Sequence, residues 1–198
     1  MKTKIIKIKG SWEDVVDDCR ASVGKGTLGH EPSEDFKKRM MINEHGPLRN
    51  IWIKWVWPGM KYWEAMHWKT HIWPALTNTQ RNDRQGEYDR NKAPQDMPVD
   101  FRGDANPQHL IDTFRKRLCK KAAEETRNTA IDFKVTLRGI EPVISDALVP
   151  NCVYRCGCPE GGCTYYAELL KKDPYVGSHN IQKRYDAYNR VFYADQNS

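Results

Sequence analysis

The 198-residue sequence contains no apolar run that approaches the length of a membrane-spanning helix. Its first ten residues, MKTKIIKIKG, place lysines between isoleucines and lack the apolar core of a secretory signal. These absences argue against a membrane protein and against secretion. We therefore expect a cytoplasmic protein with no membrane partner.

The sequence also lacks the common short motifs of catalysis. Gly24-Lys25-Gly26 does not have the G-x-x-x-x-G-K-S/T spacing with which a phosphate-binding loop holds a nucleotide. There is no nucleophile elbow, no H-E-x-x-H helix and no pair of carboxylates in a recognisable frame. No internal repeat or low-complexity segment is present. The function must therefore be sought in less common patterns.

Positive charge is only in modest excess, with 32 Lys and Arg against 26 Asp and Glu, for a net charge of +6. This charge suits an anionic ligand but is small for a dedicated nucleic-acid binder, so no nucleic-acid partner is expected. The nearest approach to a basic run is Arg115-Lys116-Arg117 with Lys120-Lys121, on an expected helix. We interpret this cluster first as a solvated helix face, and second as a patch for a nucleotide or nucleic acid.

One stretch, residues 51–90, holds six of the seven tryptophans. Its pattern predicts a buried strand over Ile51–Trp57, a break at Pro58-Gly59, a helix over Lys61–Trp73 and a polar loop beginning TNTQRNDR. A rigid apolar strand and helix that carry such a loop are typical of a polar ligand site. The alternative is that the tryptophans form core and the loop is merely solvated.

The remaining chain predicts one domain of alternating elements. We expect a first strand at Lys4–Lys9 and a helix from Ser11, where Ser11 and Asp14 approximate a capping box. The other expected elements are a helix from Ser33 to Gly46, a loop over Gln85–Pro107, a helix from Gln108 to about Arg127 that continues over Ala130–Leu137, a short helix at Pro142–Leu148, and a C-terminal amphipathic helix from Ile181.

Four cysteines lie within twelve residues: Cys152, Cys156, Cys158 and Cys163. Their C-x3-C-x-C-x4-C spacing is not the usual paired C-x2-C zinc pattern, but four thiols in a glycine-rich turn can reach one tetrahedral ion. Because a reducing cytoplasm disfavours disulfides, the alternatives are a structural zinc site and free thiols. Cys19 and Cys119 are isolated on expected helices and are interpreted as buried thiols.

The run HWKTHIWPALTNTQRNDR, residues 67–84, resembles the signature of flavin-dependent thymidylate synthases. In that family a His-Gln pair is followed by Arg-His-Arg, a serine, Asn-(Glu/Gln)-Gln-Ser and Arg-Tyr. In register, this sequence keeps His67, Asn78 and Gln80. It departs where His71-Ile72-Trp73 replaces Arg-His-Arg.

Other segments follow the same order as in that family. Cys19–Ser22 is similar to its cysteine-and-serine turn after the first helix, and Pro47-Leu48 resembles the segment that leads into the central strand. There, Arg49-Asn50 replaces Glu-His. Ser145–Pro150 resembles the family's Ala-Arg-x-Val-Leu-Pro, with Asp146 in place of the arginine. The resemblance covers about residues 1–150.

The resemblance implies an α/β (α+β) fold in which helices flank a mixed sheet. We expect residues 1–150 to form the thymidylate synthase-like core, and residues 151–198 to form a divergent Cys-rich turn and C-terminal helices of the same domain. It further implies a homo-oligomer, with a tetramer as the expected state and the flavin bound between subunits.

The resemblance also implies the ligands and the residues that hold them. FAD would be the cofactor, with methylenetetrahydrofolate and NADPH as co-substrates and a pyrimidine deoxynucleotide as substrate. The expected flavin-binding residues are Asn50, His67, His71, Asn78 and Thr79. The expected nucleotide-binding residues are Gln80, Arg81 and Arg84.

The departures from the signature leave two functions open. Asp83 and Asp146 occupy positions where the family has arginines that hold the nucleotide, and a desolvated carboxylate repels phosphate. One reading is an enzyme in which Arg81 and Arg84 replace the lost arginines. The other is a non-catalytic relative that acts as a nucleotide-binding or assembly module. His67 and His71, four residues apart on a helix, are also a possible metal pair.

Overall fold

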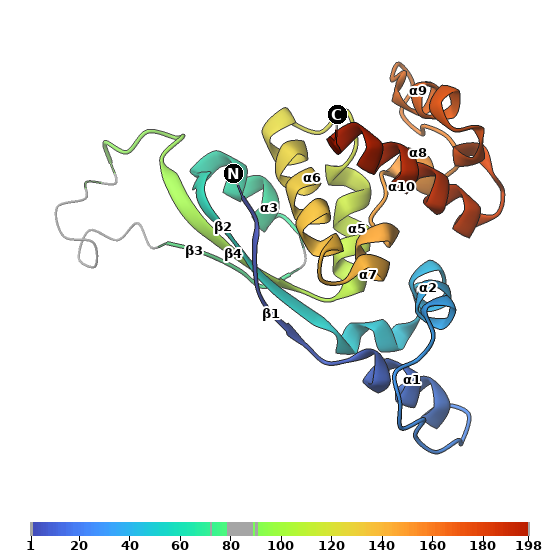
Figure 1. Ribbon diagram of the computed structural model, residues 1–198. Helices are drawn as coiled ribbons and strands as arrows, with labels where there is room; N and C mark the ends of the chain where they lie inside the picture. Colours follow the sequence, from blue (N-terminus) through green and yellow to red (C-terminus); the bar gives the residue numbers. More distant parts are fainter. Residues whose placement is uncertain (1, 72, 79–88, 90, 198) are drawn as a thin grey trace.

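The computed structural model describes residues 2–71, 73–78, 89 and 91–197, and within these residues the centre of the fold is a four-stranded sheet. Its strands are β1 (Lys4–Lys9), β2 (Trp52–Lys61), β3 (Ala75–Thr77) and β4 (Pro98–Ala105), in the order β1-β2-β4-β3 (Figure 1). The three strand pairings are all antiparallel. The expected α/β fold, with helices flanking a sheet, is confirmed, but the expected mixed sheet is wrong, because every pairing among the described strands is antiparallel.

Strand β4 lies within the segment 85–107 that was expected to be a loop, so that expectation is wrong over Pro98–Ala105. The reason is a period-two pattern in a polar segment: Val99, Phe101, Gly103 and Ala105 face the core, and the residues between them do not. Pro98 is tolerated because it is the first residue of the strand.

Strand β2 does not break at Pro58-Gly59, as had been expected, but continues to Lys61. The pairing with β4 shifts register between Trp57 and Met60, which indicates a bulge. Gly59 accommodates it with a φ of +66°, and its N–H bonds to the carboxylate of Asp100 at 3.1 Å. The proline and glycine therefore bend the strand instead of ending it.

Helices cover one face of the sheet, and the C-terminal helices lie beyond them (Figure 1). The helical elements are α1 (Trp12–Ala21), α2 (Glu34–Ile42), η1 (Gly46–Asn50), α3 (Tyr62–Lys69), α5 (Pro107–Arg117), α6 (Glu124–Arg138), α7 (Pro142–Ala147), α8 (Asn151–Tyr154), α9 (Tyr165–Lys172), η2 (Pro174–Gly177) and α10 (Ile181–Asn197). No helix in the described ranges is long and apolar enough to cross a membrane.

Local capping signals predicted the helix starts well, and the ends less well. Ser11 and Asp14 form the expected capping box of α1, and Ser33 caps α2. However, α2 ends at Ile42, before Glu44 with its φ of +49°, and α3 ends at Lys69 instead of Trp73.

The long helix expected from Gln108 onward is two helices, α5 and α6, separated by a turn over residues 118–123. Within this turn the amide of Ala122 donates to the carbonyl of Cys119 at 3.0 Å. The turn holds Cys119, Lys120 and Lys121 at the end of α5, and these residues line the pocket described below.

Most tryptophans of the central stretch are core, but Trp52 and Trp63 are half-buried, so the interpretation that these tryptophans form core is confirmed only in part. Trp55, Trp57 and Trp68 are fully buried, and Trp73 is 8% exposed. Trp57 donates its indole N–H to Thr3 at 2.9 Å, and Trp73 donates to the carbonyl of Trp68 at 3.2 Å. A second apolar cluster, built from residues of α8, α9, η2 and α10, lies in the C-terminal part.

Candidate functional site

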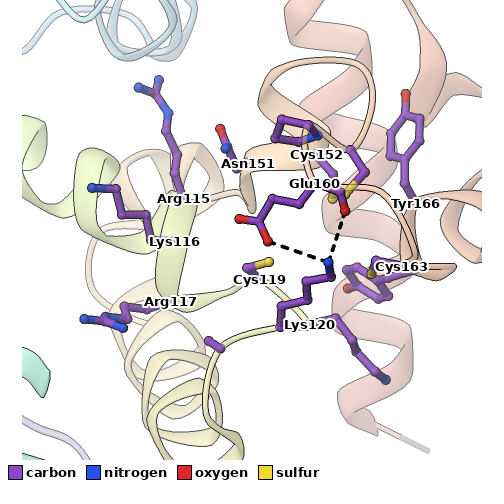
Figure 2. Close-up of a pocket in the computed structure, with 15 residues that line it drawn as sticks. Arg115, Lys116, Arg117, Cys119, Lys120, Asn151, Cys152, Glu160, Cys163 and Tyr166 are labelled. Atoms are coloured by element: carbon purple, nitrogen blue, oxygen red, sulfur yellow. Dashed lines mark hydrogen bonds and ion pairs between the residues drawn. The ribbon is translucent and has the colours of Figure 1, made fainter.

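Several basic side chains and cysteines surround a cavity of about 290 Å³. The cavity lies between the end of α5 with its following turn, the start of α8, the loop after it, and α9 (Figure 2). Its lining residues are Arg115, Lys116, Arg117, Cys119, Lys120, Lys121, Ala122, Asn151, Cys152, Cys158, Pro159, Glu160, Cys163, Tyr165 and Tyr166. We call it the α5–α9 pocket.

The rim of the α5–α9 pocket is basic. Arg115 is neutralised by an ion pair with Glu44, and its guanidinium stacks 3.5 Å from the centroid of the Tyr154 ring. Lys121 donates to the carbonyls of Glu160 and Gly161 at 3.1 and 2.8 Å, and lies 3.7 Å from the Glu160 carboxylate. Besides the neutralised Arg115, four cations and one carboxylate line the cavity, so its surroundings are positive overall.

The end of α3 is joined to this rim by one arginine. Arg117 donates its Nε–H to Nε2 of His71 at 2.8 Å, and its Nη2 donates to the carbonyl of His67 at 2.9 Å. Burial, and to a lesser extent the positive charges of Arg117 and Lys116, together lower the pKa of His71 to about 4. His71 is therefore neutral at neutral pH, and its proton lies on Nδ1 because Nε2 is the acceptor.

The structure brings only part of the predicted flavin set together. His67 and His71 both lie at the end of α3, where the Nδ1 of His67 is 3.4 Å from the hydroxyl of Thr126. Asn78 accepts a hydrogen bond from the amide of Asp100 at 3.0 Å, toward the Pro98 end of β4. Asn50 lies beyond the other end of that strand and donates to Asp18. The two asparagines are thus far apart within one chain.

Other predicted site residues lie outside the described residues: Thr79, Gln80, Arg81 and Arg84, together with Asp83. Their roles stay predictions. Asp146 is described and lies on α7, near the buried ammonium of Lys134 and not among the residues that line the α5–α9 pocket. Its carboxylate therefore does not oppose an anion at the basic rim.

The four predicted zinc ligands do not form one group. Cys152, Cys158 and Cys163 line the α5–α9 pocket, but Cys156 does not. Among the described residues, no group of three or more His, Cys, Asp or Glu is placed to hold a metal ion. The His67–His71 pair therefore has no third ligand within the described part of the chain. The structure therefore does not support the zinc site that was predicted from the spacing of Cys152, Cys156, Cys158 and Cys163.

Arg117, the partner of His71, and Cys119, in the lining of the α5–α9 pocket, have no local signal in the sequence. Arg117 was noted only as part of a basic cluster, and its contact with His71 spans 46 positions. Cys119 was interpreted as an isolated buried thiol, whereas it is half-buried and lines the pocket with three other cysteines. Neither proximity has a local sequence signal, because each depends on how α5 packs.

Comparisons with known proteins give a fold but no sequence relative. No protein-family model matches the chain, and no curated protein is similar to it in sequence. The fold is similar to the crystal structure of a UMP/dUMP methylase, PolB, from Streptomyces cacaoi, bound with 5-Br dUMP. That likeness has a TM-score of 0.57 at 12% identity, and it covers 74% of this chain and 93% of the other. At such identity the likeness shows the fold alone.

Proposed function

We propose that the protein is a divergent flavin-dependent thymidylate synthase-like enzyme that transfers a one-carbon unit to C5 of a pyrimidine deoxynucleotide. The similar fold of a pyrimidine-nucleotide methylase supports the substrate class. The observation that carries the proposal is the contact between Arg117 and His71. It puts an arginine from α5 beside His71, at the start of the segment where the family signature has arginines and this chain has none.

Arg117 suits the role of an anion-binding group at this place. Its Nε and Nη2 are used by His71, His67 and Thr70, whereas Nη1 makes no hydrogen bond within the described ranges. An arginine held by three partners is pre-organised, so little side-chain entropy is lost when it binds a phosphate. Arg81 and Arg84 remain the proposed nucleotide contacts in the following loop.

The residues at the end of α3 fit the anionic part of a flavin. Arg117 offers a fixed charge, and the exposed His67 and Thr70 offer polar atoms beside it. FAD, when bound, would supply the hydride, with methylenetetrahydrofolate and NADPH as co-substrates. His71, which is neutral and lies half-buried against Trp68 and Trp73, would orient the arginine rather than carry a proton. We propose a homotetramer, because Asn50 and Asn78 can meet one flavin only across subunits.

The alternative function is a nucleotide-binding or assembly module without catalysis. The separation of Asn50 from Asn78 within one chain favours it if the protein is monomeric. The absorption spectrum of the purified protein separates the two functions, because bound flavin absorbs visible light. Bound flavin together with tighter binding of deoxyuridylate than of deoxyuridine supports the enzyme. If the protein contains no flavin and binds deoxyuridylate no more tightly than deoxyuridine, the non-catalytic module is the function that remains.

A further inference from the structure

Three side chains with soft donor atoms lie together where α1, α2 and η1 come close to one another at one end of the sheet (Figure 1). The thiol of Cys19 on α1 lies 3.7 Å from the sulfur of Met40 on α2, and 3.6 Å from Nδ1 of His45, the residue before η1. Cys19 and Met40 are half-buried and His45 is exposed, so the three lie at the surface. We call them the Cys19 cluster; none of them lines the α5–α9 pocket.

The backbone holds Met40 and His45 side by side. The amide of His45 donates to the carbonyl of Met40 at 3.2 Å, which is the closing bond of a Schellman motif at the end of α2. The motif needs a left-handed residue, and here it is Glu44, with a φ of +49°. A glutamate is strained in this conformation. Its carboxylate, however, is fixed by an ion pair with Arg115 and a hydrogen bond of 2.7 Å from Gln108. The surrounding structure therefore holds the turn that places His45.

The two distances to the Cys19 thiol match those between ligands of one metal ion. In a tetrahedral site the metal lies about 2.3 Å from sulfur and about 2.0 Å from an imidazole nitrogen. Two sulfurs on such an ion are then about 3.8 Å apart, and a sulfur and a nitrogen are about 3.5 Å apart. The observed separations are 3.7 Å to Met40 and 3.6 Å to His45. The thiol therefore already lies at the right distance from both partners.

We propose that Cys19, Met40 and His45 bind one soft monovalent cation of the copper(I) class. Thiolate and thioether sulfurs select Cu(I) over harder cations, and imidazole also suits copper. The thioether supplies the third donor, in place of a third cysteine, histidine or carboxylate, which no such group has among the described residues. This inference does not depend on one-carbon transfer.

The charge beside the Cys19 cluster favours a cation. Binding breaks the S–H bond of Cys19, forms a sulfur–copper bond and releases one proton, with no change in oxidation state. Burial and the carboxylate of Asp18 raise the pKa of the Cys19 thiol, so the free site holds a neutral thiol. The same carboxylate attracts the incoming metal ion. The side-chain amide of Asn50 donates to Asp18 and keeps it in place.

The test is an anaerobic titration of the reduced, full-length protein with Cu(I), in competition with a coloured copper(I) chelator whose absorbance falls as the protein takes the metal. Wild type should bind its first copper at the Cys19 cluster. Met40→Leu keeps the volume and removes a ligand, so it should weaken this binding by about tenfold or more, the effect of losing even a supporting group. Met66→Leu is the matched control and should leave the affinity unchanged, because Met66 is also half-buried and packed against the core.

His45→Gln tests the nitrogen ligand without disturbing the core, because His45 is exposed. It should also weaken the binding by about tenfold or more. His179→Gln changes another exposed histidine and should leave the affinity unchanged. Equal affinity of wild type, Met40→Leu and His45→Gln overturns the proposal, and so does the absence of copper uptake by wild type.

The other cysteines of the chain also have an affinity for copper, so a second measurement identifies the sulfur that holds it. Wild type is alkylated with and without one equivalent of Cu(I), and the modified cysteines are identified by mass spectrometry. Copper should protect Cys19 and leave the exposed Cys158 reactive. Protection of Cys158 in place of Cys19 overturns the proposal. A flavin-free protein that still binds copper at Cys19 would remove the proposed enzyme and keep this site.

Discussion

Arg117 donates its Nε–H to Nε2 of His71 at 2.8 Å, and this bond fixes the end of α3 against the end of α5. It also requires a neutral imidazole, since a protonated His71 would have no acceptor at Nε2. The pKa of His71, which is lowered to about 4, agrees with a neutral ring, because burial and the two neighbouring cations all oppose a positive charge on it. The contact is therefore a pH-sensitive link between two helices.

Stability should fall as the pH drops from about 6.5 to about 4. In this window the unfolded chain binds a proton at residue 71 and the folded chain does not, so protonation favours unfolding. Below about 4 both states are protonated and this contribution stays constant. His71→Gln keeps an acceptor but cannot be protonated, so it should show a smaller loss in urea unfolding over this window. His179→Gln, at an exposed histidine, is the control; an equal loss in His71→Gln and wild type would contradict the prediction.

Arg117→Ala should weaken the binding of FAD by about 1.5–3 kcal/mol, the contribution of a charge-assisted hydrogen bond. Riboflavin, which has no phosphate, should bind to both proteins alike, because the guanidinium contacts only the phosphate groups of the flavin. Calorimetric titration with both ligands is the measurement. Arg190→Ala, an exposed arginine on α10 that pairs with Asp173, removes the same charge elsewhere. If the two variants lose affinity equally, Arg117 acts only through the overall charge.

Gly103→Ala should destabilise the fold by about 3 kcal/mol or more, at the upper end of the cost of overpacking. A methyl group at Gly103 would lie 2.1 Å from the Trp55 ring, which is fully buried and also contacts Trp57 and Phe133. Thermal unfolding should show a fall in Tm of about 6 °C or more. Gly26→Ala meets no heavy atom within 4 Å and should leave Tm nearly unchanged. A well-folded Gly103→Ala with the wild-type Tm would show that the sheet is not packed as described.

Elements whose signals are local were predictable from the sequence. The first strand, Lys4–Lys9, has its predicted bounds, and the Ser11–Asp14 capping box needs only residues three apart. Strand β4 was missed because three carboxylate- or guanidinium-bearing residues alternate with its core residues, and Pro98 and Gly103 made the segment look like a loop. Its core face exists only because Trp55 and Trp57 of β2 lie opposite.

The candidate site was less predictable because its contacts are distant in sequence. The signature window led to His67 and His71, but their partner Arg117 is supplied by a helix 46 positions after His71. The cysteine spacing suggested a cluster, yet membership depends on the turn that brings Cys119 to the pocket. The packing of the helices, and not the spacing of cysteines in the sequence, decides which thiols line the pocket.

Lys134 on α6 is fully buried. Its ammonium donates to the carbonyl of Ser145 at 2.6 Å and to Oδ1 of Asn189 at 2.8 Å, so α6 is tied to α7 and α10. Burial lowers its pKa to about 7, although the nearby Asp146 raises it in part. Between about pH 7 and pH 10 the unfolded chain binds a proton here and the folded chain does not, so wild-type stability should rise with pH.

Lys134→Met removes this titration while keeping a long apolar side chain in the space. The stability of wild type relative to Lys134→Met should therefore increase between about pH 7 and pH 9, by about 2 kcal/mol, since one proton corresponds to about 1.4 kcal/mol per pH unit. Urea unfolding of both proteins at the two pH values measures it. Lys183→Met, at an exposed lysine of α10, should show no such relative change. A constant difference between wild type and Lys134→Met would mean that the buried amine keeps its proton, with the hydrogen bonds to Ser145 and Asn189 offsetting the cost of burying its charge.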